Sequence, residues 1–113
     1  MKDSERTMKA EYRRIKPQDA KRVMDGDEPY ILLDVRTAQE YRERRIEGAT
    51  LIADTEIAAK AATELPDKDA LILAYCRSGR RSANAAKKLV SLGYTSVYDF
   101  GGIVDWPYET VKG

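Results

Sequence analysis

The chain has 113 residues, 42% of them hydrophobic, and its 20 Lys and Arg against 19 Asp and Glu give a formal net charge of +1. It can bury one core but not two ordinary domains, and its charge gives no reason to expect nucleic acid or an anionic membrane as partner. With no histidine and one cysteine, the composition excludes a Cys/His zinc site, a Cys-His nucleophile pair and an intramolecular disulfide.

Apolar residues alternate between strand-like runs and helical periodicity along residues 11–113, which we expect to form one domain after a flexible leader at residues 1–10. Pro17 suits the first turn of a helix, and Thr37 followed by Glu40 predicts a capping box. In chain order, the pattern predicts a strand at 12–15, a helix at 17–24, a strand at 30–35, a helix at 37–44, a strand at 49–53, a helix at 54–65, a strand at 70–75, a helix at 82–92 and a strand at 96–99.

Turn and capping residues separate these elements. Asp54 is predicted to cap the helix that follows it, Gly93 stands where a helix C-cap belongs, and Gly101-Gly102 is predicted to turn the chain into a terminal segment. Such alternation is typical of a parallel sheet with helices on both faces, which binds ligands outside the carboxyl ends of its strands. We therefore expect an α/β domain with a central five-stranded, mainly parallel sheet.

The only cysteine, Cys76, is followed by a loop that carries three arginines and leads into a helix-like segment. The preceding run 70–75 is nearly continuously apolar, as in a strand buried on both faces. A helix start offers unpaired N–H groups and a positive dipole end, and Gly79 lets the loop curl inward. A free cysteine titrates near pH ~8.5, and ionising it near neutrality takes roughly 2 kcal/mol. The context thus favours a reactive thiolate over the alternative of a small buried apolar side chain.

Several motifs are spread over nearly the whole chain: Leu33-Asp34-Val35-Arg36-Thr37 with Glu40-Tyr41, Ile46 with Gly48-Ala49, Tyr75-Cys76-Arg77-Ser78-Gly79-Arg80-Arg81-Ser82-Ala83, and Gly93-Tyr94, Val97-Tyr98 and Gly101-Gly102-Ile103 through Trp106. Together these motifs resemble the single-domain rhodanese family of sulfurtransferases. The sequence departs from the family at Arg45 and Glu47, where a histidine and a proline are common. These departures bear on the fit of a donor or acceptor rather than on the sulfur chemistry.

The resemblance implies a rhodanese-like three-layer domain that acts as a sulfurtransferase without a cofactor or metal. In the family, the cysteine at the position of Cys76 takes sulfane sulfur from a donor such as thiosulfate and carries it as a persulfide. A thiophilic acceptor, which is cyanide, a thiol or a partner protein, then removes the sulfur. The substrate-binding loop implied by the resemblance, whose backbone N–H groups would cradle the persulfide, is Arg77, Ser78, Gly79, Arg80, Arg81 and Ser82.

Charged residues around this loop have alternative interpretations. Arg77 and Arg80 either attract an anionic donor and the leaving sulfite or form a solvated basic face. Arg81 either binds substrate or turns back to a strand-end carboxylate such as Asp34, while Asp34 and Arg36 are expected to support the loops. Ser82 is a candidate cap for the following helix.

Two other functions remain as alternatives. A phosphatase or arsenate reductase of the same fold needs five residues between cysteine and arginine, whereas four separate Cys76 from Arg81. A rhodanese module that binds partners without turnover often lacks the cysteine, which is present here. Because no stretch approaches the length of a membrane span, we expect a cytoplasmic protein without a membrane partner.

Overall fold

A computed structural model describes residues 11–113, so the leader expected at residues 1–10 lies outside the described residues. The centre is a five-stranded sheet in the order β1-β5-β4-β2-β3, and all four strand pairings are parallel. The predicted α/β class and mainly parallel sheet are confirmed. The strands are β1 (Arg13–Arg14), β2 (Ile31–Asp34), β3 (Thr50–Leu51), β4 (Ile72–Cys76) and β5 (Val97–Gly102).

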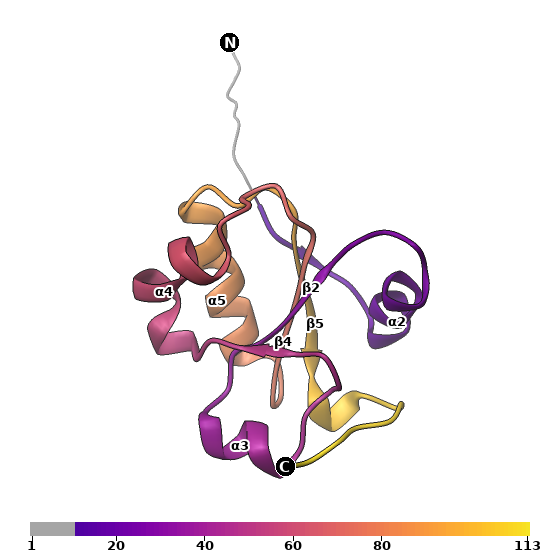
Figure 1. Cartoon of the computed structure of the whole chain (residues 1–113). Helices are drawn as coiled ribbons and strands as arrows, with labels where there is room; N and C mark the ends of the chain where they lie inside the picture. The colour runs from indigo at the N-terminus through magenta and orange to yellow at the C-terminus, as the bar shows by residue number, and fades with distance from the viewer. Residues whose placement is uncertain (1–10) are drawn as a thin grey trace.

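Helices cover both faces of this sheet. Figure 1 shows α4 and α5 together on one side, α2 on the other, and α3 beyond the strand ends. The helices are α2 (Pro17–Asp25), α3 (Ala38–Glu43), α4 (Ile57–Glu64) and α5 (Arg80–Ser91), with 3-10 turns η1 (Asp54–Glu56) and η2 (Ile103–Asp105). Within residues 11–113, no helix combines the length and apolar character needed to cross a membrane.

The central strand β4 is buried along its whole length, as its apolar run predicts. Because side chains alternate along a strand, Ala74 and Cys76 join the core layer under α4 and α5, whereas Leu73 and Tyr75 join the layer that contains Ala20 of α2. Two apolar layers thus hold β4 rigidly. Its last residue, Cys76, sits on the α5 side.

The capping predictions succeed at one helix and fail at another. At α3 the Thr37 hydroxyl accepts from the Glu40 N–H and the Glu40 carboxylate accepts from the Thr37 N–H, which confirms the capping box. At Asp54 the prediction is wrong: the residue opens η1, α4 begins only at Ile57, and the Asp54 carboxylate accepts from Lys88 instead. The Asp54 carboxylate therefore binds the amine of Lys88 on α5 and does not cap α4.

Two predicted boundaries near the cysteine loop are also wrong. Helix α5 begins at Arg80 rather than Ser82, because Gly79 adopts a positive φ of 111° and serves as the N-cap. Ser82 therefore lies inside the helix and does not cap it. Gly101 and Gly102 do not form a turn but complete β5, where Gly102 pairs with Cys76.

Candidate active site

Cys76 places its sulfur at the carboxyl end of β4, where the chain turns into α5. The side chain is free of disulfide and buried, with 1% of its surface exposed. The N–H of Gly79 points back and donates to Sγ over 2.9 Å. The positive φ of Gly79 allows this reversal, and the unpaired first-turn amides of α5 follow directly. The sulfur thus sits at the positive end of a helix with one amide already aimed at it.

A second polar contact to the sulfur comes from inside α5. Ser82 Oγ lies 3.5 Å from Sγ and donates to Asp99 Oδ1 over 2.7 Å. Asp99 on β5 is fully buried. The sequence did not lead us to include Asp99 among the site residues, although an acidic residue inside a short strand, two residues before a glycine pair, was an available signal. The structure thereby connects the sulfur to a buried carboxyl group.

The backbone of β5 presses against the cysteine loop at Gly102. A Cβ atom on Gly102 would lie 2.0 Å from the carbonyl oxygen of Arg77 and 2.5 Å from Ser78 Cα. The same Arg77 oxygen accepts from the N–H of Val104. The loop is therefore held by main-chain contact that only glycine permits.

The three loop arginines do not act alike. Arg77 and Arg80 are exposed, as is Ser78. Arg81 makes a bidentate ion pair with Glu40 on α3, with N–O distances of 2.8 and 2.9 Å, instead of turning back to Asp34. The two hydrogen bonds raise the pKa of Arg81. Arg81 therefore ties the start of α5 to α3, which brings two loops at this sheet edge together.

The Arg81 pair predicts a specific loss of stability in acid. Arg81 is the main cause that lowers the Glu40 pKa from 4.5 to about 2. A carboxyl group with a depressed folded pKa stabilises the fold above its unfolded value, and that contribution is lost as pH falls from 4.5 towards 2. Because both side chains are partly exposed, we expect Glu40→Gln to remove only about 1–2 kcal/mol at neutral pH and nothing near pH ~2.

Denaturant unfolding at a series of pH values measures this difference. Gln preserves the capping interaction with Thr37 while it removes the charge, so the change isolates the ion pair. Glu43→Gln on the same helix, whose carboxylate contacts Gln39, is the matched control. A stability gap between wild type and Glu40→Gln that does not vary with pH would contradict the prediction.

Asp34 and Arg36, predicted to support the loops, form a buried network at the end of β2. Asp34 accepts from the backbone N–H of Arg36, from its guanidinium at 2.6–3.2 Å and from the hydroxyl of Tyr75. Arg36 also donates to the carbonyl of Arg44. Burial alone would lower the pKa of Arg36, but the bonds to Asp34 raise it. Burial, with Asp34 nearby, raises the pKa of Tyr75.

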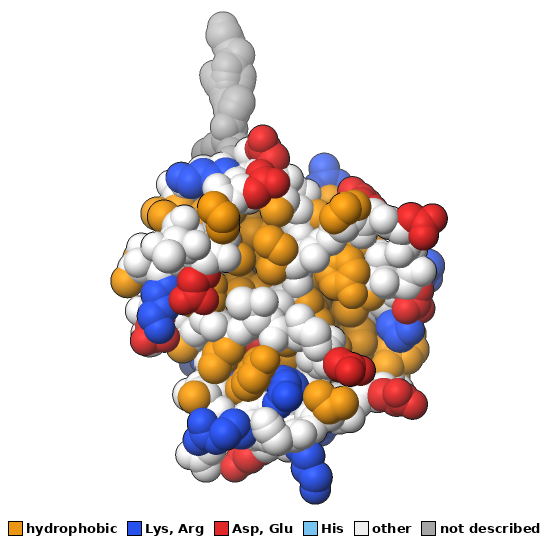
Figure 2. Space-filling model, viewed as in Figure 1, with side chains coloured by type: hydrophobic (Ala, Val, Ile, Leu, Met, Phe, Trp, Pro, Cys, Tyr) orange, Lys and Arg blue, Asp and Glu red, His pale blue; other side chains and the backbone are white. Residues whose placement is uncertain are grey.

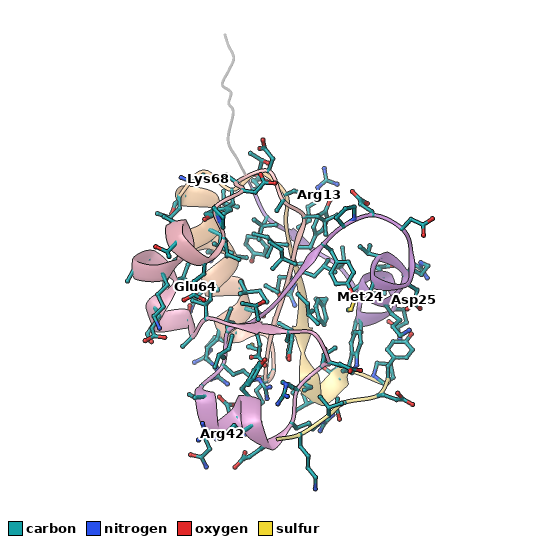
Figure 3. The ribbon with its side chains drawn as sticks, viewed as in Figure 1. Arg13, Met24, Asp25, Arg42, Glu64 and Lys68 are labelled. Atoms are coloured by element: carbon teal, nitrogen blue, oxygen red, sulfur yellow. The ribbon has the colours of Figure 1, made fainter. Side chains whose placement is uncertain are left out.

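A cavity of about 290 Å³ opens beside the cysteine loop at this edge. It combines positive, negative and aliphatic side chains, and larger hollows elsewhere in residues 11–113 contain none of the loop residues. Figure 3 shows Arg42 projecting outward from α3, and this side chain does not line the cavity. The lining residues are Arg36, Glu40, Glu43, Arg44, Arg77, Ile103 and Val104.

The surface around the site shows no large region of one charge sign among the described residues on the face seen in Figure 2. Acidic and basic side chains are interspersed there, in keeping with a net charge of +1. Arg45 donates to the backbone of Tyr41 and Gly113 and pairs with Val111, while Glu47 is exposed. No group of three or more potential metal-binding side chains occurs within residues 11–113.

Fold and site together define an α/β domain that presents a cysteine in a strand-to-helix loop at the carboxyl edge of a parallel sheet. The model of the rhodanese-like domain family matches residues 16–108. The chain therefore belongs to the rhodanese family of sulfurtransferases and is an enzyme of the rhodanese type.

Named relatives agree with this assignment. The chain is 37% identical to thiosulfate sulfurtransferase PspE of Escherichia coli over 72% of this chain and 78% of that protein. It is 33% identical to thiosulfate sulfurtransferase GlpE of Pseudomonas savastanoi over 91% and 98% of the two chains. Among solved structures, a rhodanese with anions from E. coli is 35% identical and superimposes with a TM-score of 0.70 over 75% of this chain and all of its own.

Proposed function

We propose that the protein moves sulfane sulfur from a donor such as thiosulfate, through a persulfide on Cys76, to a thiophilic acceptor. The observation that carries the proposal is the position of Sγ, which is buried at the start of α5 with the Gly79 N–H directed at it. The relatives named thiosulfate sulfurtransferase support the choice of donor.

In the first half of the reaction, the Cys76 thiolate attacks the outer sulfur of thiosulfate. A new S–S bond forms to Sγ while the S–S bond of thiosulfate breaks, and sulfite leaves with the electron pair. The exposed Arg77 and Arg80 attract the dianionic donor and offset charge on the leaving sulfite. No general base is required if the thiolate is already formed.

In the second half, a nucleophile such as cyanide or a thiol attacks the outer sulfur of the persulfide. The S–S bond breaks and its electron pair returns to Sγ, which restores the thiolate. The amides of the loop from Arg77 to Ser82 stabilise the anionic outer sulfur meanwhile. The cavity beside the loop is the entry for the acceptor, and its mixed charges suit a polar or zwitterionic molecule or the surface of a partner protein.

The site geometry does not favour the two alternative functions. An oxyanion-binding phosphatase loop needs an arginine aimed into its centre, but Arg81 is engaged by Glu40. A module without turnover does not require a cysteine sulfur that contacts both a backbone amide and a hydroxyl group, as Cys76 does. Both features favour sulfur transfer.

Intact mass measurement tests the proposal. Wild-type protein treated with thiosulfate is expected to gain one sulfur atom and to lose it after addition of cyanide or a thiol. Cys76→Ser removes the only cysteine of the chain and is expected to reduce both events to background. Sulfur uptake by Cys76→Ser, or hydrolysis of an aryl phosphate by a wild type that takes up no sulfur, would refute the proposal.

A further inference from the structure

The Ser82 hydroxyl has more acceptors around it than it can serve. It lies 2.7 Å from Asp99 Oδ1, 3.2 Å from the carbonyl oxygen of Gly79 and 3.4 Å from that of Gly101. A hydroxyl carries one proton, and the shortest of these contacts is to the carboxyl oxygen. The remaining neighbour, Cys76 Sγ at 3.5 Å, therefore faces a lone pair of Ser82 and acts as the donor while it is a thiol.

The role of Asp99 Oδ1 as an acceptor is set by a second contact. The backbone N–H of Gly101 donates to this same oxygen over 2.9 Å, so Oδ1 presents lone pairs whether or not the other oxygen carries a proton. The other oxygen, Oδ2, is buried and has no hydrogen-bond partner within residues 11–113. Among the described residues, the cation that comes within 4 Å of Oδ2 is Arg14, whose Nε is 3.9 Å away on a side chain that is 67% exposed.

An incompletely satisfied buried carboxyl group costs stability, so its presence in the fold calls for an explanation. We propose that Asp99 is a positioning residue for Cys76: by holding the proton of Ser82, it turns a lone pair of that hydroxyl toward the sulfur. A lone pair accepts the S–H of a thiol but repels a bare thiolate. Asp99 thus favours the thiol and the persulfide of Cys76 over the free thiolate.

This arrangement opposes the Gly79 amide, which donates to the sulfur and favours the anion. In the persulfide the charge moves to the outer sulfur, so Ser82 no longer faces an anionic Sγ and the conflict is relieved. The relief of this conflict in the persulfide rests on the proposed function. The effect of Asp99 on the ionisation of Cys76 does not rest on it, because that effect concerns the protein before it has taken up sulfur.

Alkylation of the single cysteine by iodoacetamide tests the proposal without any sulfur transfer. The ratio of the rate at neutral pH to the rate at strongly alkaline pH reports the ionised fraction independently of access to the sulfur. We expect this ratio to rise about threefold in Asp99→Asn, whose amide oxygen is a weaker acceptor, and about tenfold in Asp99→Ala, which frees the Ser82 proton for the thiolate. Asp105→Asn, an exposed carboxylate after β5, is the control.

The same substitutions in a Ser82→Ala background separate the hydroxyl from simple charge. Arg14 and Arg81, the charged groups that face Asp99 and Cys76 from β1 and α5, are unchanged in every variant. If Asp99 acts through Ser82, the increases of the alkylation-rate ratio in Asp99→Asn and Asp99→Ala both fall to less than about twofold in the Ser82→Ala background. Equal effects of Asn and Ala that persist in Ser82→Ala would assign the effect to charge and overturn the proposal, as would no effect at all.

Infrared spectroscopy provides a measurement that does not depend on the folding of an Asp99 variant. With one cysteine in the chain, the S–H stretching band belongs to Cys76 alone. We expect it at lower frequency in wild type than in Ser82→Ala, because the thiol donates to Ser82. Identical bands would overturn the proposal even if sulfur transfer proceeds normally, whereas a shifted band in a protein that takes up no sulfur would leave the inference intact and refute the proposed function.

Discussion

Gly102→Ala is expected to abolish most sulfur transfer and to destabilise the fold by about 3 kcal/mol or more. The added Cβ would meet the Arg77 carbonyl oxygen at 2.0 Å and the Arg77 carbonyl carbon at 2.5 Å. These are backbone atoms that cannot rotate away, so the cysteine loop itself must move. That movement breaks the bond from the Val104 N–H to Arg77 and carries the Gly79 amide away from the sulfur.

Urea unfolding and the rate of sulfur uptake from thiosulfate measure the two consequences of this substitution. Gly26→Ala is the matched control, because Gly26 has a negative φ and its new Cβ would make only ordinary contacts of 3.5 Å. We expect the control to change stability by less than about 1 kcal/mol and to leave uptake intact. Stability and uptake of Gly102→Ala within the range of the control would show that the close approach is not required.

Asp34→Asn is expected to destabilise the protein by about 3–5 kcal/mol, because it leaves the Arg36 guanidinium buried without a counter-charge. Asp34 is fully buried, and Arg36 is 4% exposed. The carboxylate accepts its two shortest hydrogen bonds through Oδ2, at 2.6 Å from the Arg36 guanidinium and at 2.8 Å from the Tyr75 hydroxyl. The Asn side chain that replaces it has an amide oxygen that is a weaker acceptor. Its NH2 group takes the place of one carboxylate oxygen and would be a donor that faces donors of the surrounding residues.

Denaturant unfolding at neutral pH measures this loss, with Asp54→Asn as the control. Asp54 pairs with Lys88, which is 43% exposed, so its substitution is expected to cost no more than about 1 kcal/mol. Adding Arg36→Met to Asp34→Asn removes the unpaired buried charge and is expected to recover part of the stability. A loss for Asp34→Asn as small as that of the control, or no recovery in the double variant, would contradict this account.

Sequence patterns predicted the local features near the site because those features depend on neighbouring residues. The apolar run before Cys76 is a strand buried on both faces, and the Thr37 and Glu40 pair is a capping box. The same local reasoning failed at Ser82, where a glycine in a left-handed conformation starts α5 earlier. A positive φ at Gly79 is permitted by the sequence but is selected by the packing of the loop.

Residues distant in the chain were beyond local reasoning. Arg81 was expected to bind substrate or to turn back to a strand-end carboxylate such as Asp34. It pairs instead with Glu40, 41 residues away, whose carboxylate the capping box holds at the sheet edge. Asp99 was unassigned because its contact with Ser82 exists only when β5 lies beside β4 under α5. Gly102 was predicted to be a turn residue, because neighbouring residues in the sequence do not show which backbone atoms a side chain at this position would clash with.

By itself, the order of residues determined the α/β alternation, the buried central strand and the place of the cysteine at the end of that strand, since apolar periodicity and turn chemistry act over a few neighbouring residues. Only the tertiary structure decided which groups meet the sulfur and which arginine is engaged by a carboxylate. Those choices depend on the parallel register of β4 with β5 and on the approach of α3 to the start of α5, which bring together side chains and amides from separate parts of the chain.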